Sequence, residues 1–155
     1  MGNGRRCQHQ LYEVTMFHSI LLASDGSAAA ERACAITASL ASSYSASVFI
    51  IHAFHKPPNI LAEPNYNEQM NERRAAAYNL VDDVANRLKQ QGVSNVTNAV
   101  IEGHASDVIL NVIGTHHPDL LIIGARGMSP WRGLVMGSVS LAVTQRATCP
   151  VLVVK

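Results

Sequence analysis

The chain has few charged residues, and the two signs nearly cancel. Only 15% of its 155 residues are Asp, Glu, Lys or Arg, and the formal net charge at pH 7 is +1. Nucleic acids and anionic membrane surfaces are bound largely through an excess of basic residues, so the charge suggests neither partner. No apolar run approaches the roughly 18 residues that a membrane helix requires. The composition predicts one soluble domain, long enough to bury a core.

Cysteine is scarce as well. Cys7, Cys34 and Cys149 are an odd number and show no C-x-x-C spacing. Neither a disulfide framework nor a zinc site is therefore indicated. We interpret Cys34 and Cys149 as core thiols and expect the protein in the reducing cytoplasm.

The first 17 residues lack the features of a targeting segment. Glu13 and Thr15 interrupt the apolar core that a secretory signal needs, and Arg6 stands where a myristoylation motif requires Ser or Thr. We predict a poorly ordered extension over 1–17 and a single domain over 18–155.

Apolar β-branched runs alternate with helical patterns through the rest of the chain. The helical stretch 28–43 carries Ala29, Ala33, Ile36 and Leu40 on one stripe. Such alternation is typical of a parallel sheet covered by helices on both faces. The predicted strands are 18–24, 46–53, 96–101, 119–124 and 150–154, and the predicted helices are 28–43, 68–91, 106–114 and 138–146.

A glycine-spaced loop follows the fourth predicted strand and ends where the last helix starts. It contains Gly124, Gly127 and Gly137, followed by the hydroxyls of Ser138 and Ser140. The first turn of a helix leaves its N–H groups unpaired and carries the positive end of the helix dipole, so it attracts anions. Glycine tolerates positive φ and lets a ligand oxygen approach the backbone. The sequence therefore predicts a phosphate-binding loop.

The spacing of this loop matches a known signature. Gly124, Gly127, Gly137 and Ser138 fit the pattern G-x2-G-x9-G-[ST]. This pattern resembles the nucleotide loop in the ATP-binding branch of the universal stress protein family. The similarity includes the family's first, second, fourth and last strands, at 18–27, 48–53, 119–124 and 149–154.

The resemblance implies a fold and a set of nucleotide contacts. It selects a single doubly wound, Rossmann-like α/β sheet with five parallel strands in the order 3-2-1-4-5. In that order Asp25 and Gly124 end neighbouring strands where the chain reverses direction, which is where such sheets bind ligands. The residues expected at the nucleotide are Ala23, Ser24, Asp25, Ala53, Ile123, Gly124, Arg126, Gly127, Gly137, Ser138, Val139 and Ser140.

The resemblance also implies individual roles. Asp25 would bind the ribose and adenine side of the nucleotide and lie near the metal, with backbone contacts from Ala23 and Ser24 beside it. The backbone of Ala53 would bind the adenine edge, and Ile123 would cover the ring.

Several of these residues have structural alternatives. Asp25 could instead be the N-cap of the helix that follows, a role that Ser27 could fill equally well. Arg126 could pair with a phosphate or be a solvated loop arginine. His52 is more typical of a hydrogen-bonded core residue than of a catalyst. The proline-containing segment 54–67 could be a flap over the site or a partner surface.

The implied function is ATP binding with Mg²⁺ by a regulatory module of the stress response. Mg²⁺ would be held mainly by phosphate oxygens and water, with Asp25 as a candidate ligand. One alternative is a slow ATP hydrolase or a phosphoryl- or adenylyl-transfer enzyme, although no G-x4-G-K-[ST] lysine is present. The other is a structural dimerisation module without nucleotide, which the intact glycine signature argues against. Binding without turnover is the prediction.

The last predicted strand, 150–154, would form an edge of the sheet. An apolar edge with unpaired backbone groups is prone to association unless it is covered. In the family this strand pairs with its twin across a two-fold axis, so a homodimer through residues 150–154 is expected. A proline at Leu152 is expected to remove a ladder donor and release monomers.

Overall fold

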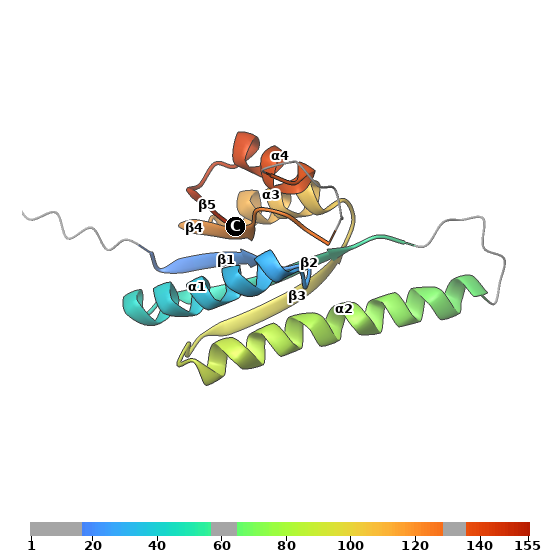
Figure 1. The fold of residues 1–155 in the computed structure, drawn as a ribbon, viewed down its shortest axis with the longest axis horizontal. Helices are drawn as coiled ribbons and strands as arrows, with labels where there is room; N and C mark the ends of the chain where they lie inside the picture. Colours follow the sequence, from blue (N-terminus) through green and yellow to red (C-terminus); the bar gives the residue numbers. More distant parts are fainter. Residues whose placement is uncertain (1–16, 57–64, 129–135) are drawn as a thin grey trace, which may run out of the picture.

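The computed structural model describes residues 17–56, 65–128 and 136–155. Five parallel strands form one sheet in the order β3-β2-β1-β4-β5, which confirms the predicted fold and strand order (Figure 1). In chain order the elements are β1 (Ser19–Ala23), α1 (Ala28–Tyr44), β2 (Ser47–Phe54), α2 (Asn65–Gln90), β3 (Val96–Glu102), α3 (Ala105–His116), β4 (Leu120–Gly124), α4 (Ser138–Arg146) and β5 (Val151–Val154).

The helices form two layers, one on each face of the sheet. α1 and α2 cover one face, and α3 and α4 cover the other (Figure 1). Side chains of β1 alternate between the two cores, so Leu22 packs toward α1 and α2 while Leu21 packs toward α3. This alternation follows from the two-residue repeat of a strand. The helical spacing of Val108, Ile109, Val112 and Ile113 in the sequence predicts an inward stripe for α3, and all four are buried.

The buried stripe of α1 differs from the prediction. Ile36 is 37% exposed, whereas the small residues Ala30, Cys34 and Ala41 are buried. A helix whose inner face is made of small side chains can lie closer to the sheet than one with Ile inward. The close approach is visible at Gly124 of β4, where an added Cβ would lie 3.0 Å from the α1 backbone.

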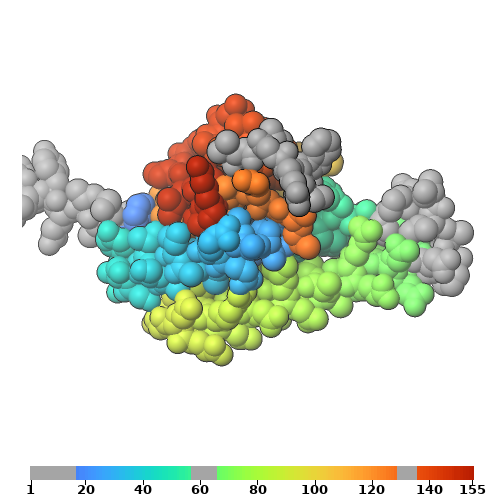
Figure 2. Space-filling view, in the orientation of Figure 1, coloured from blue at the N-terminus to red at the C-terminus, as the bar shows by residue number. Residues whose placement is uncertain are grey.

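α2 begins three residues earlier than predicted and extends beyond the sheet. None of the residues 66–76 is buried, and this part of the helix projects from the body of the protein (Figure 2). The buried positions begin at Ala77 and continue through Val81, Val84 and Leu88. Most of the predicted flap or partner surface, residues 57–64, lies outside the described residues.

The first described residue, Phe17, packs on the core. Its ring lies against that of Tyr44 at the end of α1, with centroids 5.5 Å apart in an edge-to-face arrangement. The rest of the predicted extension, 1–16, lies outside the described residues. Within the described part of the chain, no helix is long and apolar enough to cross a membrane.

Candidate functional site

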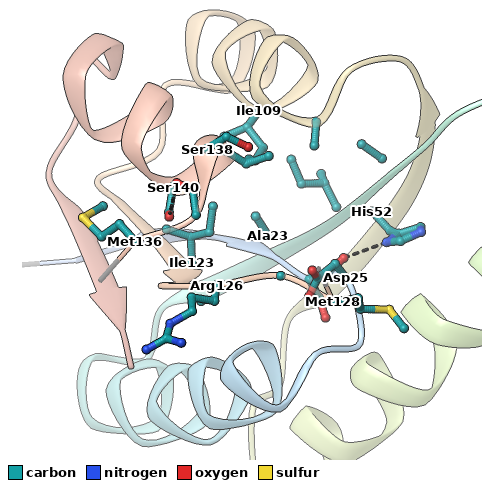
Figure 3. A pocket seen from close by; sticks show the side chains of 18 residues that line it. Ala23, Asp25, His52, Ile109, Ile123, Arg126, Met128, Met136, Ser138 and Ser140 are labelled. Atoms are coloured by element: carbon teal, nitrogen blue, oxygen red, sulfur yellow. Dashed lines mark hydrogen bonds between the residues drawn. The ribbon is translucent and has the colours of Figure 1, made fainter. Parts of the chain in front are cut away.

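A cavity of about 550 Å³ opens at the carboxyl ends of β1, β2 and β4 (Figure 3). This volume lies within the roughly 300–1,000 Å³ typical of small-ligand sites. All twelve residues predicted from the sequence line the cavity, so the fold brings them together. Six further residues line it: Ile51, His52, Ala105, Ile109, Met128 and Met136. The nucleotide contacts themselves stay a prediction.

The additional lining residues come from places that the loop signature does not cover. Ala105 and Ile109 belong to α3, which closes the apolar side of the cavity. The inward stripe of that helix already included Ile109, and this was the signal available in the sequence. Met128 and Met136 flank the segment 129–135, which lies outside the described residues, and only the folded structure places them at the cavity.

The first turn of α4 presents unpaired backbone donors to the cavity. Gly137 is the N-cap, with φ −77° and ψ 162°, and no side chain caps the helix. The first intrahelical bond runs from the Leu141 N–H to the Gly137 carbonyl, at 3.0 Å. The N–H groups of Ser138, Val139 and Ser140 therefore have no intrahelical partner. They and the positive end of the helix dipole make this end of the cavity suited to an anion.

The Ala125 carbonyl holds the glycine loop against α4. It accepts hydrogen bonds from the Gly137 N–H at 2.7 Å and from the Ser140 hydroxyl at 2.8 Å. Ser140 is 2% exposed, and its hydroxyl donates to an acceptor within the protein. In this conformation the group that Ser140 can offer to an anion is its N–H, which has no partner within the helix, and its contact with a nucleotide stays a prediction.

Two of the three signature glycines, Gly124 and Gly127, stand where a Cβ would be crowded, whereas a Cβ on Gly137 would make ordinary contacts at 3.5 Å or more. Gly26, Gly92 and Gly103 have positive φ, but Gly124, Gly127 and Gly137 do not. The expectation of positive φ is thus wrong at these three positions, and the close approach of a ligand oxygen stays a prediction. A Cβ on Gly127 would lie 2.5 Å from Oδ2 of Asp25, far inside normal contact distance.

Ser27, not Asp25, is the N-cap of α1. Its hydroxyl accepts a hydrogen bond from the Ala30 N–H at 3.2 Å. Asp25 instead accepts the Ser27 N–H on Oδ1 at 3.0 Å. Its other oxygen, Oδ2, faces Gly127 across the cavity entrance. The N-cap alternative for Asp25 is therefore excluded, and its carboxylate lies at the entrance.

Two hydrogen bonds connect Ser24, which follows β1, to Ile51 and His52 of β2. The Ser24 N–H donates to the Ile51 carbonyl at 3.0 Å, and the His52 Nδ1 lies 2.7 Å from the Ser24 carbonyl. A carbonyl can only accept, so Nδ1 carries the proton. The prediction of His52 as a hydrogen-bonded residue is confirmed. The Ser24 N–H is already engaged, so the backbone contact implied for Ser24 cannot use that group.

The backbone of Ala53 faces the cavity with both of its polar groups. In parallel strands, alternate residues bond to opposite neighbours. The Ile51 carbonyl bonds toward β1 and the Phe54 carbonyl bonds toward the end of β3, at Gly103. Ala53 therefore directs its N–H and C=O toward β1, which has already ended at Ala23. This leaves one donor and one acceptor for a ligand.

Arg126 lies at the rim with an exposed side chain. It has no ion pair with a described residue, and its guanidinium extends away from Asp25 toward α1 (Figure 3). The conformation matches the solvated alternative. Arg126 also lines the cavity, and its contact with a phosphate stays a prediction.

Two further histidines and the two described cysteines have structural surroundings. The His116 ring packs against Phe49, with centroids 4.7 Å apart, and His117 is the left-handed C-cap of α3. Burial raises the pKa of the Cys34 and Cys149 thiols, so both are protonated at neutral pH. Among the residues that the structure describes, no group of three or more His, Cys, Asp or Glu could hold a metal.

These features define a doubly wound α/β protein with a small-ligand cavity at the point where the strand order reverses. The chain belongs to the universal stress protein family, because the model of that family matches residues 16–155. A curated relative from Thermus aquaticus, a universal stress protein in the QAH/OAS sulfhydrylase 3′ region, is 33% identical over 140 residues. The match covers 90% of this chain and all of the relative.

Solved structures have the same fold. The universal stress protein UspA from Lactobacillus plantarum superposes with a TM-score of 0.81 at 20% identity, covering 90% of this chain and 98% of that one. A universal stress protein in complex with cAMP has a TM-score of 0.70 at 23% identity, covering 90% and 97%. A family member from Arabidopsis thaliana with AMP bound has a TM-score of 0.63 at 22% identity, covering 88% and 90%.

Proposed function

We propose that this protein binds ATP with Mg²⁺ and acts as a nucleotide-dependent regulatory module in the cytoplasm. The observation that carries the proposal is the row of unpaired N–H groups at Ser138, Val139 and Ser140, facing a cavity at the switch point. The adenine nucleotides in the cAMP and AMP complexes of the same fold support the class of ligand. The free thiols Cys34 and Cys149 are compatible with a reducing compartment.

The cavity has an apolar part and an anion-binding part, which match the base and the phosphates of a nucleotide. One part is apolar, with Ile109 and Ile123 on facing elements, and includes the free donor and acceptor of Ala53. Adenine offers a flat apolar surface with one acceptor and one donor at its edge, which suits this part. The other part holds the glycine loop and the start of α4, and suits the phosphates. The presence of both an apolar part and an anion-binding part favours an adenine nucleotide over a purely apolar or purely anionic ligand.

Asp25 is the single carboxylate among the described residues that line the cavity. Mg²⁺ binds few protein ligands and keeps several waters, so one carboxylate with phosphate oxygens suffices. In the proposal, Asp25 Oδ2 contacts either the ribose or the hydrated metal. Because no second carboxylate stands beside it to share a proton transfer, we propose binding rather than rapid turnover as the output.

Calorimetric titration of the purified full chain with ATP and Mg²⁺ tests the proposal. Saturable binding without release of phosphate over the same hours is expected. Rapid release of phosphate would favour a hydrolase, and release of pyrophosphate an adenylyl-transfer enzyme. Absence of any heat with ATP, AMP and cAMP would overturn nucleotide binding and favour a structural module.

Replacement of Asp25 separates its two proposed contacts. Asp25→Ala should weaken ATP binding by about 1–3 kcal/mol, the cost expected when a charge-assisted hydrogen bond is lost. Asp25→Asn should lose less if the carboxylate accepts from ribose hydroxyls. Calorimetry with and without Mg²⁺ distinguishes the roles. If both variants lose the same ATP affinity with Mg²⁺ present and neither loses affinity without it, Asp25 contacts the metal. Unchanged affinity in both variants would remove Asp25 from the site.

We also propose that two copies pair through β5. Among the strands that the structure describes, β5 pairs only with β4, and its burial pattern leaves Val151, Leu152 and Val153 half-exposed. An antiparallel partner strand would satisfy the outer N–H and C=O groups and cover these side chains. Light scattering at micromolar concentration should give the mass of a dimer, and a monomer mass would refute the pairing.

A further inference from the structure

Ser27 connects the start of α1 to the glycine loop that lines the cavity. Its hydroxyl oxygen caps α1 by accepting the Ala30 N–H, and its proton is donated to the Arg126 carbonyl at 3.1 Å. Arg126 is 99 residues away in the sequence and belongs to the glycine loop after β4. Ser27 is only 9% exposed, so water competes little for these bonds. One hydroxyl thus holds the start of α1 and the glycine loop together.

The bond to Arg126 fixes the direction of the next amide. In a trans peptide the C=O and the following N–H point in opposite directions. The Arg126 carbonyl points to Ser27 at the start of α1, so the Gly127 N–H points away from α1. A Cβ on Gly137 would lie 3.8 Å from the Gly127 nitrogen, which places this amide beside the start of α4. The Gly127 N–H is therefore turned toward the same space as the unpaired donors of α4.

We propose that Ser27 is a positioning residue of the nucleotide site. By donating to the Arg126 carbonyl it turns the Gly127 N–H toward the anion, so that this donor adds to those of Ser138, Val139 and Ser140. Ser27 itself need not touch the ligand. The inference rests on the proposed nucleotide function and concerns only the phosphate end of the ligand.

Three substitutions separate the positioning role from the capping role. Ser27→Gly removes the donor but weakens a helix start far less than most substitutions, because Gly is tolerated at an N-cap. Ser27→Thr retains both bonds. Thr37→Val is the matched control, because it removes a different buried hydroxyl of α1, one bonded to the Ala33 carbonyl. Thermal unfolding of each variant measures the structural effect.

Titrations with AMP and with adenosine, followed by NMR, measure the functional effect. In Ser27→Gly we expect AMP affinity to fall about fivefold, the equivalent of one ordinary hydrogen bond, with adenosine affinity unchanged. Ser27→Thr and Thr37→Val should bind both compounds like the parent. An equal loss for adenosine, or no loss for AMP, would overturn the positioning role.

A ligand-free measurement distinguishes this inference from the proposed function. The Gly127 amide resonance should shift and exchange faster with solvent in Ser27→Gly, and should be restored in Ser27→Thr. If the parent binds neither AMP nor adenosine, the nucleotide proposal fails, and the amide resonance still tests whether Ser27 sets this peptide. An unchanged Gly127 resonance in Ser27→Gly would refute the inference directly.

Discussion

Gly127→Val is expected to abolish nucleotide binding while the domain still folds. A Cβ at this position would lie 2.5 Å from Oδ2 of Asp25, so either the carboxylate or the loop must move. Both lie at the cavity entrance, and the branched side chain would also occupy the space beside the proposed phosphate donors. Gly127 is exposed and outside the core, so the change should affect the ligand rather than the fold. Calorimetry with ATP and Mg²⁺ measures the loss.

Gly114→Val provides the matched control. Gly114 lies in α3, and a Cβ there would meet nothing within 4 Å. The same change of side chain should therefore leave ATP affinity unaltered. Cooperative unfolding of both variants would confirm that each is folded. If folded Gly127→Val bound ATP as tightly as the parent, the glycine loop would not be the phosphate site.

Proline substitutions in β5 are expected to have opposite effects at adjacent positions. The carbonyls of Pro150 and Val154 accept N–H groups of Leu121 and Ala125, so alternate residues of β5 bond to β4. Leu152 belongs to this set, and its register partner is Ile122. The ladder donor that a proline at Leu152 would remove therefore bonds to β4 and does not face a partner subunit. Leu152→Pro should break the sheet itself, whereas Val153→Pro should remove an outward donor and release monomers.

The two variants are compared in one experiment. Chemical denaturation should show Leu152→Pro to be less stable than the parent by about 1–3 kcal/mol or more, since a buried acceptor loses its partner. Val153→Pro should retain most of the stability, because proline is tolerated where its missing N–H would face outward on an edge strand. Light scattering should then give a monomer for Val153→Pro. A stable dimer of Val153→Pro would show that the outer edge of β5 is not the interface.

The element order and the location of the cavity could be predicted from the sequence. Alternating apolar runs and helical stripes are local patterns, and a parallel sheet constrains their connections strongly. The resemblance to the family selected the strand order in which the ends of β1 and β4, at Asp25 and Gly124, lie side by side. Because the carboxyl ends of neighbouring parallel strands meet at one edge, residues 100 positions apart were predicted to line the same cavity, and they do.

The role of each group at the site depended on distances between segments far apart in the chain. Only the folded structure shows that Ser140 donates to Ala125 and that Ser27 donates to Arg126. A serine next to a glycine loop has the same local sequence whether its hydroxyl faces a ligand or a carbonyl.

The same limit applies to burial and to the sheet edge. The stripe of α1 was misplaced at Ile36 because the closeness of that helix to β4 depends on Gly124, far along the chain. Which residues of β5 direct their N–H groups away from the sheet depends on the register of β5 with β4. The sequence by itself determined which elements form and where their ends meet, because propensity and periodicity are properties of neighbouring residues. The tertiary structure decided which atoms remain free for a ligand or a partner, because that depends on contacts that form only when the elements pack.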